Sequence, residues 1–102
     1  AHPALLRLIG LVARAGAAHD IPVSVCGEMA ADPFYTPLLV GLGLRILSVS
    51  PTSIPVVKRM VRRLDAGACA AFAREAQDFG TAAEVERALA DRLRAWTPDL
   101  FG

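Results

Sequence analysis

The sequence has 102 residues, of which 54% are hydrophobic, and its 11 basic and 10 acidic side chains give a formal net charge of +1. A chain of this length has room for one small domain, because it buries roughly two-thirds of its unfolded surface and forms a single core. The charges are balanced along the chain. Residues 1–55 carry three basic and three acidic side chains, and residues 56–102 carry eight basic and seven acidic ones. These totals do not indicate a basic surface for nucleic acid, and we expect no nucleic-acid partner.

The apolar runs and the cysteines exclude two further classes of protein. No run approaches the length of about 18 residues that a membrane span needs, and the first residues lack the pattern of a secretory leader. We therefore expect no membrane insertion and a cytoplasmic location. Cys26 and Cys69 lie 43 residues apart, outside any CxxC pair or cluster with histidine. The sequence thus predicts neither a disulfide framework nor a zinc site.

The first predicted element is a helix over residues 3–18. Its apolar residues recur at spacings of three and four, which predicts a buried face formed by Leu5, Leu8, Ile9, Val12 and Gly16. Pro3 suits a first helical turn, and the helix is expected to end at His19 and Asp20. His2 and His19 therefore stand at the helix ends, where we expect capping or surface positions rather than catalysis.

Apolar runs at residues 22–26 and 45–50 are predicted strands, with a short helix expected between them within residues 33–42. Asp32 can cap this helix, while Pro37 leaves its first residue open, because proline past the first turn removes a hydrogen bond. The alternation of helix and strand predicts the α/β class with a parallel sheet. Two parallel strands alone do not form a stable sheet, so other strands must complete it.

Further helices are expected in the second half of the chain. Ser53 can cap the first of them, whose buried stripe is predicted to be Ile54, Val57, Val61 and Leu64. Its other side is basic and is interpreted as a solvated face: Lys58, Arg59, Arg62 and Arg63. An alanine-rich helix follows at residues 68–77, in which Cys69 is expected to be a packing residue.

The last predicted helix covers residues 81–96. Thr81 and Glu84 match a capping box at its start. Its buried stripe is predicted to be Val85, Leu89, Leu93 and Trp96. Residues 97–102 are expected to be irregular.

The tripeptide Cys26-Gly27-Glu28 follows the first predicted strand and is the main candidate for chemistry. Ligands of parallel sheets bind at the carboxyl ends of the strands, where loops converge. A cysteine there can donate a proton, because an ordinary thiol stays protonated at neutral pH. Gly27 lets a ligand approach the backbone, and Glu28 can orient a partner. A buried structural cysteine is the alternative that composition favours.

Three serines, Ser48, Ser50 and Ser53, cluster at the matching end of the second predicted strand. Their hydroxyls can contact an anionic substrate beside the N-terminus of the following helix. Capping and turn formation are the competing interpretation.

Three ordered blocks resemble one enzyme family: residues 25–33 (VCGEMAADP), 37–44 (PLLVGLGL) and 47–55 (LSVSPTSIP) followed by Lys58. They are similar to the C-terminal barrel of phosphoenolpyruvate-utilising enzymes, above all enzyme I of the bacterial phosphotransferase system and its nitrogen-related paralogue. Pyruvate phosphate dikinase and phosphoenolpyruvate synthase share the Cys-Gly pair, but the Ser-Ile-Pro-x-x-Lys stretch ending at Lys58 is more like enzyme I. The resemblance covers almost the whole chain, more loosely after about residue 65.

This resemblance implies a fold, namely the last quarter of a (β/α)8 TIM barrel. The final βα units would occupy residues 1–65, and residues 66–102 would be a C-terminal helical extension. Further barrel segments are then expected upstream, and the chain is expected to be inactive alone. A homodimer is also implied, with the apolar faces of residues 37–44 and 81–96 partly meeting another subunit.

The resemblance also implies a reaction. Family members bind phosphoenolpyruvate and Mg²⁺, pass the phosphoryl group to an enzyme histidine and on to a small phosphocarrier protein, and release pyruvate. Cys26 matches the family's cysteine, the acid that protonates C3 of the enolate. Supporting substrate contacts are expected from Gly27, Glu28, Ser48 and Ser50. The metal ligands, the phosphate-binding arginines and the acceptor histidine would lie in segments outside this chain.

Two other interpretations stay open. The chain can be a non-catalytic module that associates with itself through exposed barrel edges. A thiol-based redox protein is a weaker alternative, because no resolving cysteine stands close to Cys26 in the sequence.

Overall fold

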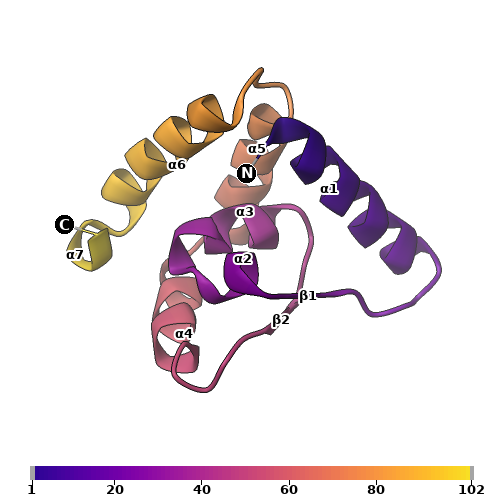
Figure 1. Ribbon diagram of the computed structural model, residues 1–102, viewed down its shortest axis with the longest axis horizontal. Coiled ribbons are helices and arrows are strands. Elements are labelled where there is room, and N and C mark those ends of the chain that lie inside the picture. The colour runs from indigo at the N-terminus through magenta and orange to yellow at the C-terminus, as the bar shows by residue number, and fades with distance from the viewer. Residues whose placement is uncertain (1, 102) are drawn as a thin grey trace.

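The computed structural model describes residues 2–101, apart from the side chains of Glu28, Leu100 and Phe101. Helices dominate it, and α1 and α6 lie on opposite sides of α5 (Figure 1). The elements in chain order are α1 (Pro3–Ala18), β1 (Ser24–Cys26), α2 (Glu28–Ala31), the 3-10 turn η1 (Pro33–Tyr35), α3 (Thr36–Gly41), β2 (Ile46–Ser48), α4 (Ile54–Arg63), α5 (Ala66–Ala76), α6 (Ala82–Trp96) and α7 (Pro98–Phe101). None of the helices within residues 2–101 is long and apolar enough to cross a membrane.

The two strands form a small parallel sheet, with Cys26 opposite Ser48 at their carboxyl ends. A helical crossover of α2, η1 and α3 joins them, as parallel strands require. Parallel pairing with a helical connection agrees with the predicted α/β class. In the described part of the chain the sheet has two strands, so each strand keeps one edge without a partner strand.

The hydrophobic core centres on the packing of α3 against α5. Gly41 makes this close approach possible, because a Cβ atom at that position would overlap the backbone carbonyl of Cys69. Leu38, Leu39 and Phe72 are fully buried in the same core. Cys69 is buried with them, which confirms its prediction as a packing residue.

The proline-rich segment before α3 enters the helix through a capped turn. The Asp32 carboxylate accepts a hydrogen bond of 3.0 Å from the backbone N–H of Phe34 and caps η1. Helix α3 then begins at Thr36, so Pro37 falls within the first turn, where its missing N–H removes no helical hydrogen bond. Both pieces lie inside the range predicted to hold one helix.

Helix α6 confirms its predicted cap and its predicted stripe. The Thr81 hydroxyl accepts a hydrogen bond of 3.2 Å from the backbone N–H of Glu84. The stripe faces the core along its length, with a partly buried member at its end: Val85, Leu89, Leu93 and Trp96. Trp96 packs edge-on against Phe72, with ring centroids 6.3 Å apart. The stripe therefore fixes α6 to α5.

The apolar faces of residues 37–44 and 81–96, which are expected partly to meet another subunit, are largely covered within the chain itself. Apart from the partly buried Val40 and Trp96, their large apolar side chains are fully or almost fully buried in the chain's own core. Burial within one chain leaves these faces covered, and dimerisation itself stays a prediction.

Helix α1 has the predicted extent, but of its predicted buried face only Gly16 and the partly buried Ile9 face the core. Leu5, Leu8 and Val12 are 44%, 56% and 49% exposed. The core-facing side carries mostly small residues, namely Pro3, Leu6, Gly10, Ala13 and Gly16. Small side chains permit close contact, since a Cβ atom at Gly16 would overlap the side chain of Val23. Because α1 is apolar on two faces, its periodicity did not determine which face packs.

The start of α1 confirms the role expected of His2. Its Nδ1 accepts a hydrogen bond of 3.0 Å from the backbone N–H of Ala4, which caps the helix. His19 follows the last helical residue and is exposed. Both histidines therefore stand at helix ends, as predicted.

The predicted stripe of α4 is wrong in two of its positions. Val57 and Met60 are buried, whereas Ile54 and Val61 are 41% and 44% exposed. Ser53 occupies the N-cap position, but its hydroxyl lies 3.2 Å from that of Ser50 and makes no capping bond to the backbone. The predicted basic face is exposed as expected: Lys58, Arg59, Arg62 and Arg63.

The tail that was expected to be irregular forms α7 instead. The Thr97 hydroxyl donates a hydrogen bond of 3.0 Å to the carbonyl of Leu93 where α6 ends, and Pro98 then begins the next helix. Arg63 donates from both terminal nitrogens to the two carboxylate oxygens of Asp99, one of them at 2.7 Å. This contact between α4 and α7 organises a segment too short for sequence periodicity to reveal.

Candidate functional site

The carboxyl edge of the sheet carries the main predicted site residue, Cys26. Strand register places it directly opposite Ser48, so a thiol and a hydroxyl from two distant segments meet at one edge. Both residues are exposed, and the Cys26 thiol is free. The edge can therefore receive a ligand, because ligands of parallel sheets bind at the carboxyl ends of the strands, and the role of Cys26 as a proton donor stays a prediction.

Gly27 turns the chain from β1 into α2. Its φ of +90° lies in the left-handed region that favours glycine, and no atom lies within 4 Å of the position that a Cβ would take. Backbone conformation, not crowding, therefore requires glycine here, and the space beside it stays open. The Gly27 carbonyl accepts a hydrogen bond of 3.1 Å from the backbone N–H of Ala31. This bond stabilises α2, which the sequence did not predict.

Of the supporting residues, Ser50 is held in a turn rather than beside Cys26. Ser50 lies in the turn beyond β2, where its hydroxyl is 3.2 Å from the hydroxyls of both Thr52 and Ser53. These bonds favour the turn-forming interpretation of Ser50 over a place beside the thiol. The side chain of Glu28 lies outside the described residues, so its orienting role stays a prediction.

Cys69 differs from Cys26 in reactivity as well as in position. Burial raises the pKa of the Cys69 thiol to about 11, and the nearby Asp65 carboxylate adds to the rise. A buried thiol that stays neutral at physiological pH is inert. Cys26 is therefore the cysteine that a substrate can reach.

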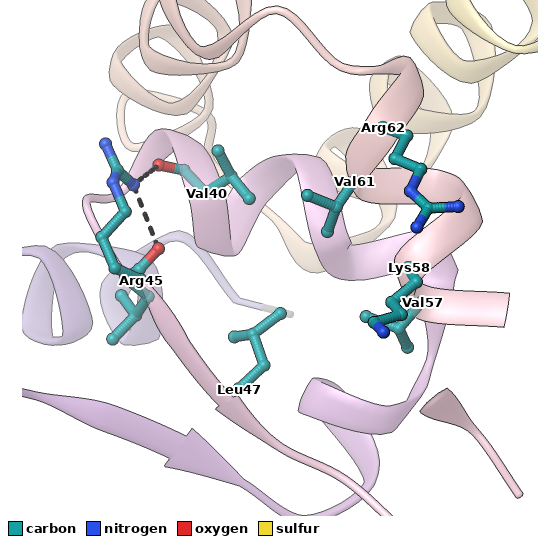
Figure 2. A pocket seen from close by; sticks show the side chains of 8 residues that line it. Val40, Arg45, Leu47, Val57, Lys58, Val61 and Arg62 are labelled. Carbon is teal, nitrogen blue, oxygen red and sulfur yellow. Dashed lines mark hydrogen bonds between the residues drawn. The ribbon is translucent and has the colours of Figure 1, made fainter. Parts of the chain in front are cut away.

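Sequence reasoning missed a hollow between α3, β2 and α4, with a volume of about 460 Å³ (Figure 2). Val57 and Val61 line it from α4, and Lys58 and Arg62 lie at its border. The signal was present in the sequence, because the two valines and the two cations each stand four residues apart. Their offset by one residue places both pairs along one edge of the helix.

The described side chains at the strand edge do not form a metal site. Among residues 2–101, no group of three or more His, Cys, Asp or Glu side chains that could hold a metal ion is found. Cys26 and Ser48 offer sulfur and a hydroxyl, whereas Mg²⁺ prefers carboxylate oxygens, phosphates and water. The described residues therefore do not fit Mg²⁺, and its ligands outside this chain stay a prediction.

Residues 1–66 match the family model described as PEP-utilising enzyme, PEP-binding domain. The matched segment includes both strands, the crossover between them and helix α4. It therefore contains the whole candidate edge.

Relatives among characterised proteins are similar over most of the chain. A multiphosphoryl transfer protein of Escherichia coli O6:H1 is 39% identical over 97 residues, which is 95% of this chain and 11% of the relative. A phosphoenolpyruvate-protein phosphotransferase of Mycoplasma pneumoniae is 40% identical over 86 residues, 84% of this chain and 15% of the relative. A protein of Escherichia coli K12 named for the phosphoenolpyruvate-dependent phosphotransferase system is 37% identical over 89 residues. The match covers 87% of this chain and 12% of the relative. The chain thus spans less than one-sixth of these relatives.

Proposed function

Because the chain belongs to the family of PEP-utilising enzymes, where PEP is phosphoenolpyruvate, we propose that it forms part of a PEP-dependent phosphotransferase. The observation that carries this proposal is the register of Cys26 and Ser48 at the carboxyl edge of a parallel sheet. Ligands of α/β sheets and barrels bind at that edge. The names of the relatives, which include PEP-protein phosphotransferase, support this reaction over that of a dikinase or a synthase.

The proposed setting of the chain is the last quarter of a (β/α)8 barrel, with β1 and β2 as its final strands. Two features support this setting. Each strand has an outer edge without a partner strand among the described residues, and one apolar face of α1 is exposed. Strands and helices of a longer polypeptide would cover both, because open sheet edges and apolar helix faces are costly in water. Residues 66–102 then form the helical extension, in which α5 packs against α3.

Cys26 acts in this proposal as a general acid. Transfer of the phosphoryl group breaks the bond between phosphorus and the enol oxygen of PEP and leaves the enolate of pyruvate. The Cys26 thiol gives its proton to C3, a C–H bond forms there, and the enolate oxygen becomes the keto oxygen. The resulting thiolate regains a proton from solvent. The phosphoryl group passes to a histidine outside this chain and then to a small phosphocarrier protein.

The other edge residues support the same step. Gly27 leaves space for a ligand to approach the backbone, since no atom beyond its two chain neighbours lies within 4 Å of the position of a Cβ. Ser48 places a hydroxyl across from Cys26, where it can donate a hydrogen bond to a carboxylate or an enolate oxygen. Glu28 and Ser50 are proposed as outlying substrate contacts. Mg²⁺, held by segments outside this chain, would supply charge neutralisation on the phosphate.

Exposure of the edge explains why the chain alone is expected to be inactive. Cys26 and Ser48 are both open to solvent, so water competes with the thiol for the enolate. Active sites that handle reactive intermediates exclude water. Closure by the remaining barrel segments is therefore part of the proposal.

The experiment is a chimera with the phosphotransferase of Mycoplasma pneumoniae. The segment of that enzyme that matches this chain is replaced by this chain. Pyruvate release from PEP is then measured for the chimera with the unchanged sequence and for the chimera with Cys26→Ala. We expect the chimera to turn over and the variant to lose about 100-fold or more in rate, since general acids contribute about 10²–10⁴-fold.

Cys69→Ala is the matched control, because it removes a thiol from the same chain far from the edge. It is expected to keep the rate of the chimera within about twofold, since the buried thiol plays no part in the chemistry. Equal rates for the two variants would refute the role of Cys26. A folded chimera without turnover would contradict the phosphotransferase itself and favour a non-catalytic module.

A further inference from the structure

The hollow between α3, β2 and α4 combines an apolar floor with a basic border. Val40, Leu47, Val57 and Val61 point into it from three different elements (Figure 2). Its volume of about 460 Å³ falls within the range of roughly 300–1,000 Å³ that is typical of small-molecule sites. Sites of that kind are mostly apolar with a few polar groups that fix orientation. The hollow therefore has the size and lining of a binding site.

The cations at its border have no carboxylate partners among the described side chains. Arg45 donates hydrogen bonds of 2.9 and 3.0 Å to the backbone carbonyls of Val40 and Leu44, which carry no charge. The ion pairs found among the described residues involve neither Lys58 nor Arg62. All of the residues that line the hollow are apolar or basic. Its border thus presents uncompensated positive charge.

Lys58 and Arg62 also border a second, basic hollow of about 450 Å³ that adjoins the first along α4. Arg59 and Arg63 line this second hollow, and Arg63 is already bound to Asp99. Lys58 and Arg62 therefore form a ridge between an apolar surface and a basic one. Cations one helical turn apart can hold a single anionic group between them.

We propose that the apolar hollow binds a small amphipathic anion, a carboxylate with an unbranched apolar chain. The chain lies against Val57, Val61 and Leu47, and the carboxylate accepts charge-assisted hydrogen bonds from Lys58 and Arg62. Charge complementarity argues for an anion, because no acidic side chain lines either hollow. The apolar floor argues against a free inorganic anion, which would leave it unfilled. The site is separate from the strand edge, since neither Cys26 nor Ser48 lines the hollow.

The test uses decanoate with the full 102-residue chain, below the concentration at which the ligand forms micelles. Calorimetry measures stoichiometry and Kd, and methyl NMR identifies the side chains that respond. We expect one saturable site, with the largest shifts at Val57, Val61 and Leu47. Decyltrimethylammonium, which has the same apolar chain and the opposite charge, is expected to bind at least about tenfold more weakly. Equal affinity for the two ligands would overturn the proposal.

Two double variants distinguish contacts at the border of the hollow from the general attraction between a basic protein surface and an anion. Lys58→Gln with Arg62→Gln is expected to weaken decanoate binding at least about tenfold, because charge-assisted contacts to the head are lost. Arg59→Gln with Arg87→Gln removes the same charge from exposed positions that do not line the hollow, and is expected to leave Kd within about twofold. Equal losses in the two double variants would refute a specific site.

Val61→Phe tests the hollow without changing charge. Val61 is exposed at its edge, so a larger side chain can fill the space without entering the core, and decanoate binding should be lost. Leu8→Phe, on the exposed face of α1, is the control and should bind normally. Retained binding in Val61→Phe would overturn the proposal. Sedimentation tests the alternative. If it shows a dimer that Val61→Phe dissociates but decanoate does not, the hollow binds a second copy of this chain instead.

Discussion

Around α3, α5 and α6 the large apolar side chains are buried, whereas around β1, β2 and the outer face of α1 many remain in contact with solvent. Phe72 and Leu89 represent the first region, and Leu8 and Ile46 the second. The two regions thus differ in how much apolar side chain they expose. The helical region therefore contributes most of the buried apolar surface, while the strand region, which carries the candidate site, would be covered by other elements in the proposed barrel.

The largest expected effect comes from shortening one large apolar side chain in each region and comparing the losses of stability. Phe72→Ala removes a fully buried ring and should lower the free energy of unfolding by about 3–5 kcal/mol. Leu47→Ala, at a partly buried position of β2, should cost only about 1 kcal/mol, since much of the side chain is already hydrated. Urea titration followed by circular dichroism measures both. Equal losses would show that the sheet is as well packed as the core.

A second contrast compares glycines that are required for different reasons. Gly41→Ala forces a methyl group onto the backbone of α5 and should cost about 1–3 kcal/mol or more by pushing the helices apart. Gly27→Ala meets no neighbouring atom and should cost about 1 kcal/mol through its positive φ alone. The same urea titrations compare them. A larger loss at Gly27 would contradict the open space assigned to the strand edge.

The helix caps give a smaller contrast. Thr81→Ala removes the hydroxyl that accepts from the Glu84 backbone N–H and should destabilise the chain by about 1 kcal/mol. Ser53→Ala removes a hydroxyl that makes no capping bond and should change stability by less than about 0.5 kcal/mol. Thermal unfolding of the two variants tests the difference. A larger loss for Ser53→Ala would contradict the geometry of the turn before α4.

The smallest expected effect is the pH dependence contributed by Asp99. Its hydrogen bonds with Arg63 hold the pKa of the Asp99 carboxyl below the ordinary value. The ion pair therefore stabilises the fold above the pKa of an unfolded aspartate, and this stabilisation is lost as pH falls through the lowered pKa. Asp99→Asn should lower the melting temperature slightly at neutral pH and not at strongly acidic pH. An equal decrease at both would show that charge is not the cause.

Elements with one dominant pattern could be predicted from the sequence. The stripe of α6 is apolar on one face only, and its cap follows a local rule, so both are confirmed. The positions of Cys26 and Ser48 at matching strand ends also follow from local signals, because parallel strands share one carboxyl edge.

The remaining elements depend on contacts that sequence patterns do not encode. Helix α1 is apolar on two faces, and Gly16 beside Val23 favours the one with small residues. Helix α2 has four residues and depends on the turn at Gly27, while α7 is organised by Arg63 from a distant helix. The valines and cations of α4 stand at helical spacing in the sequence, but the hollow beside Lys58 also needs α3 and β2, so that spacing alone does not show the hollow itself.

The measurement that tests the central proposal most directly is the stereochemistry of protonation at C3. Phosphoenolpyruvate with deuterium in one configuration at C3, converted by the chimera in tritiated water, gives pyruvate with a chiral methyl group. With Cys26 present, we expect one configuration, because a fixed thiol protonates one face of the enolate. With Cys26→Ala we expect an equal mixture from water, and with Cys69→Ala a single configuration. A single configuration from Cys26→Ala would contradict the assignment of Cys26 as the acid.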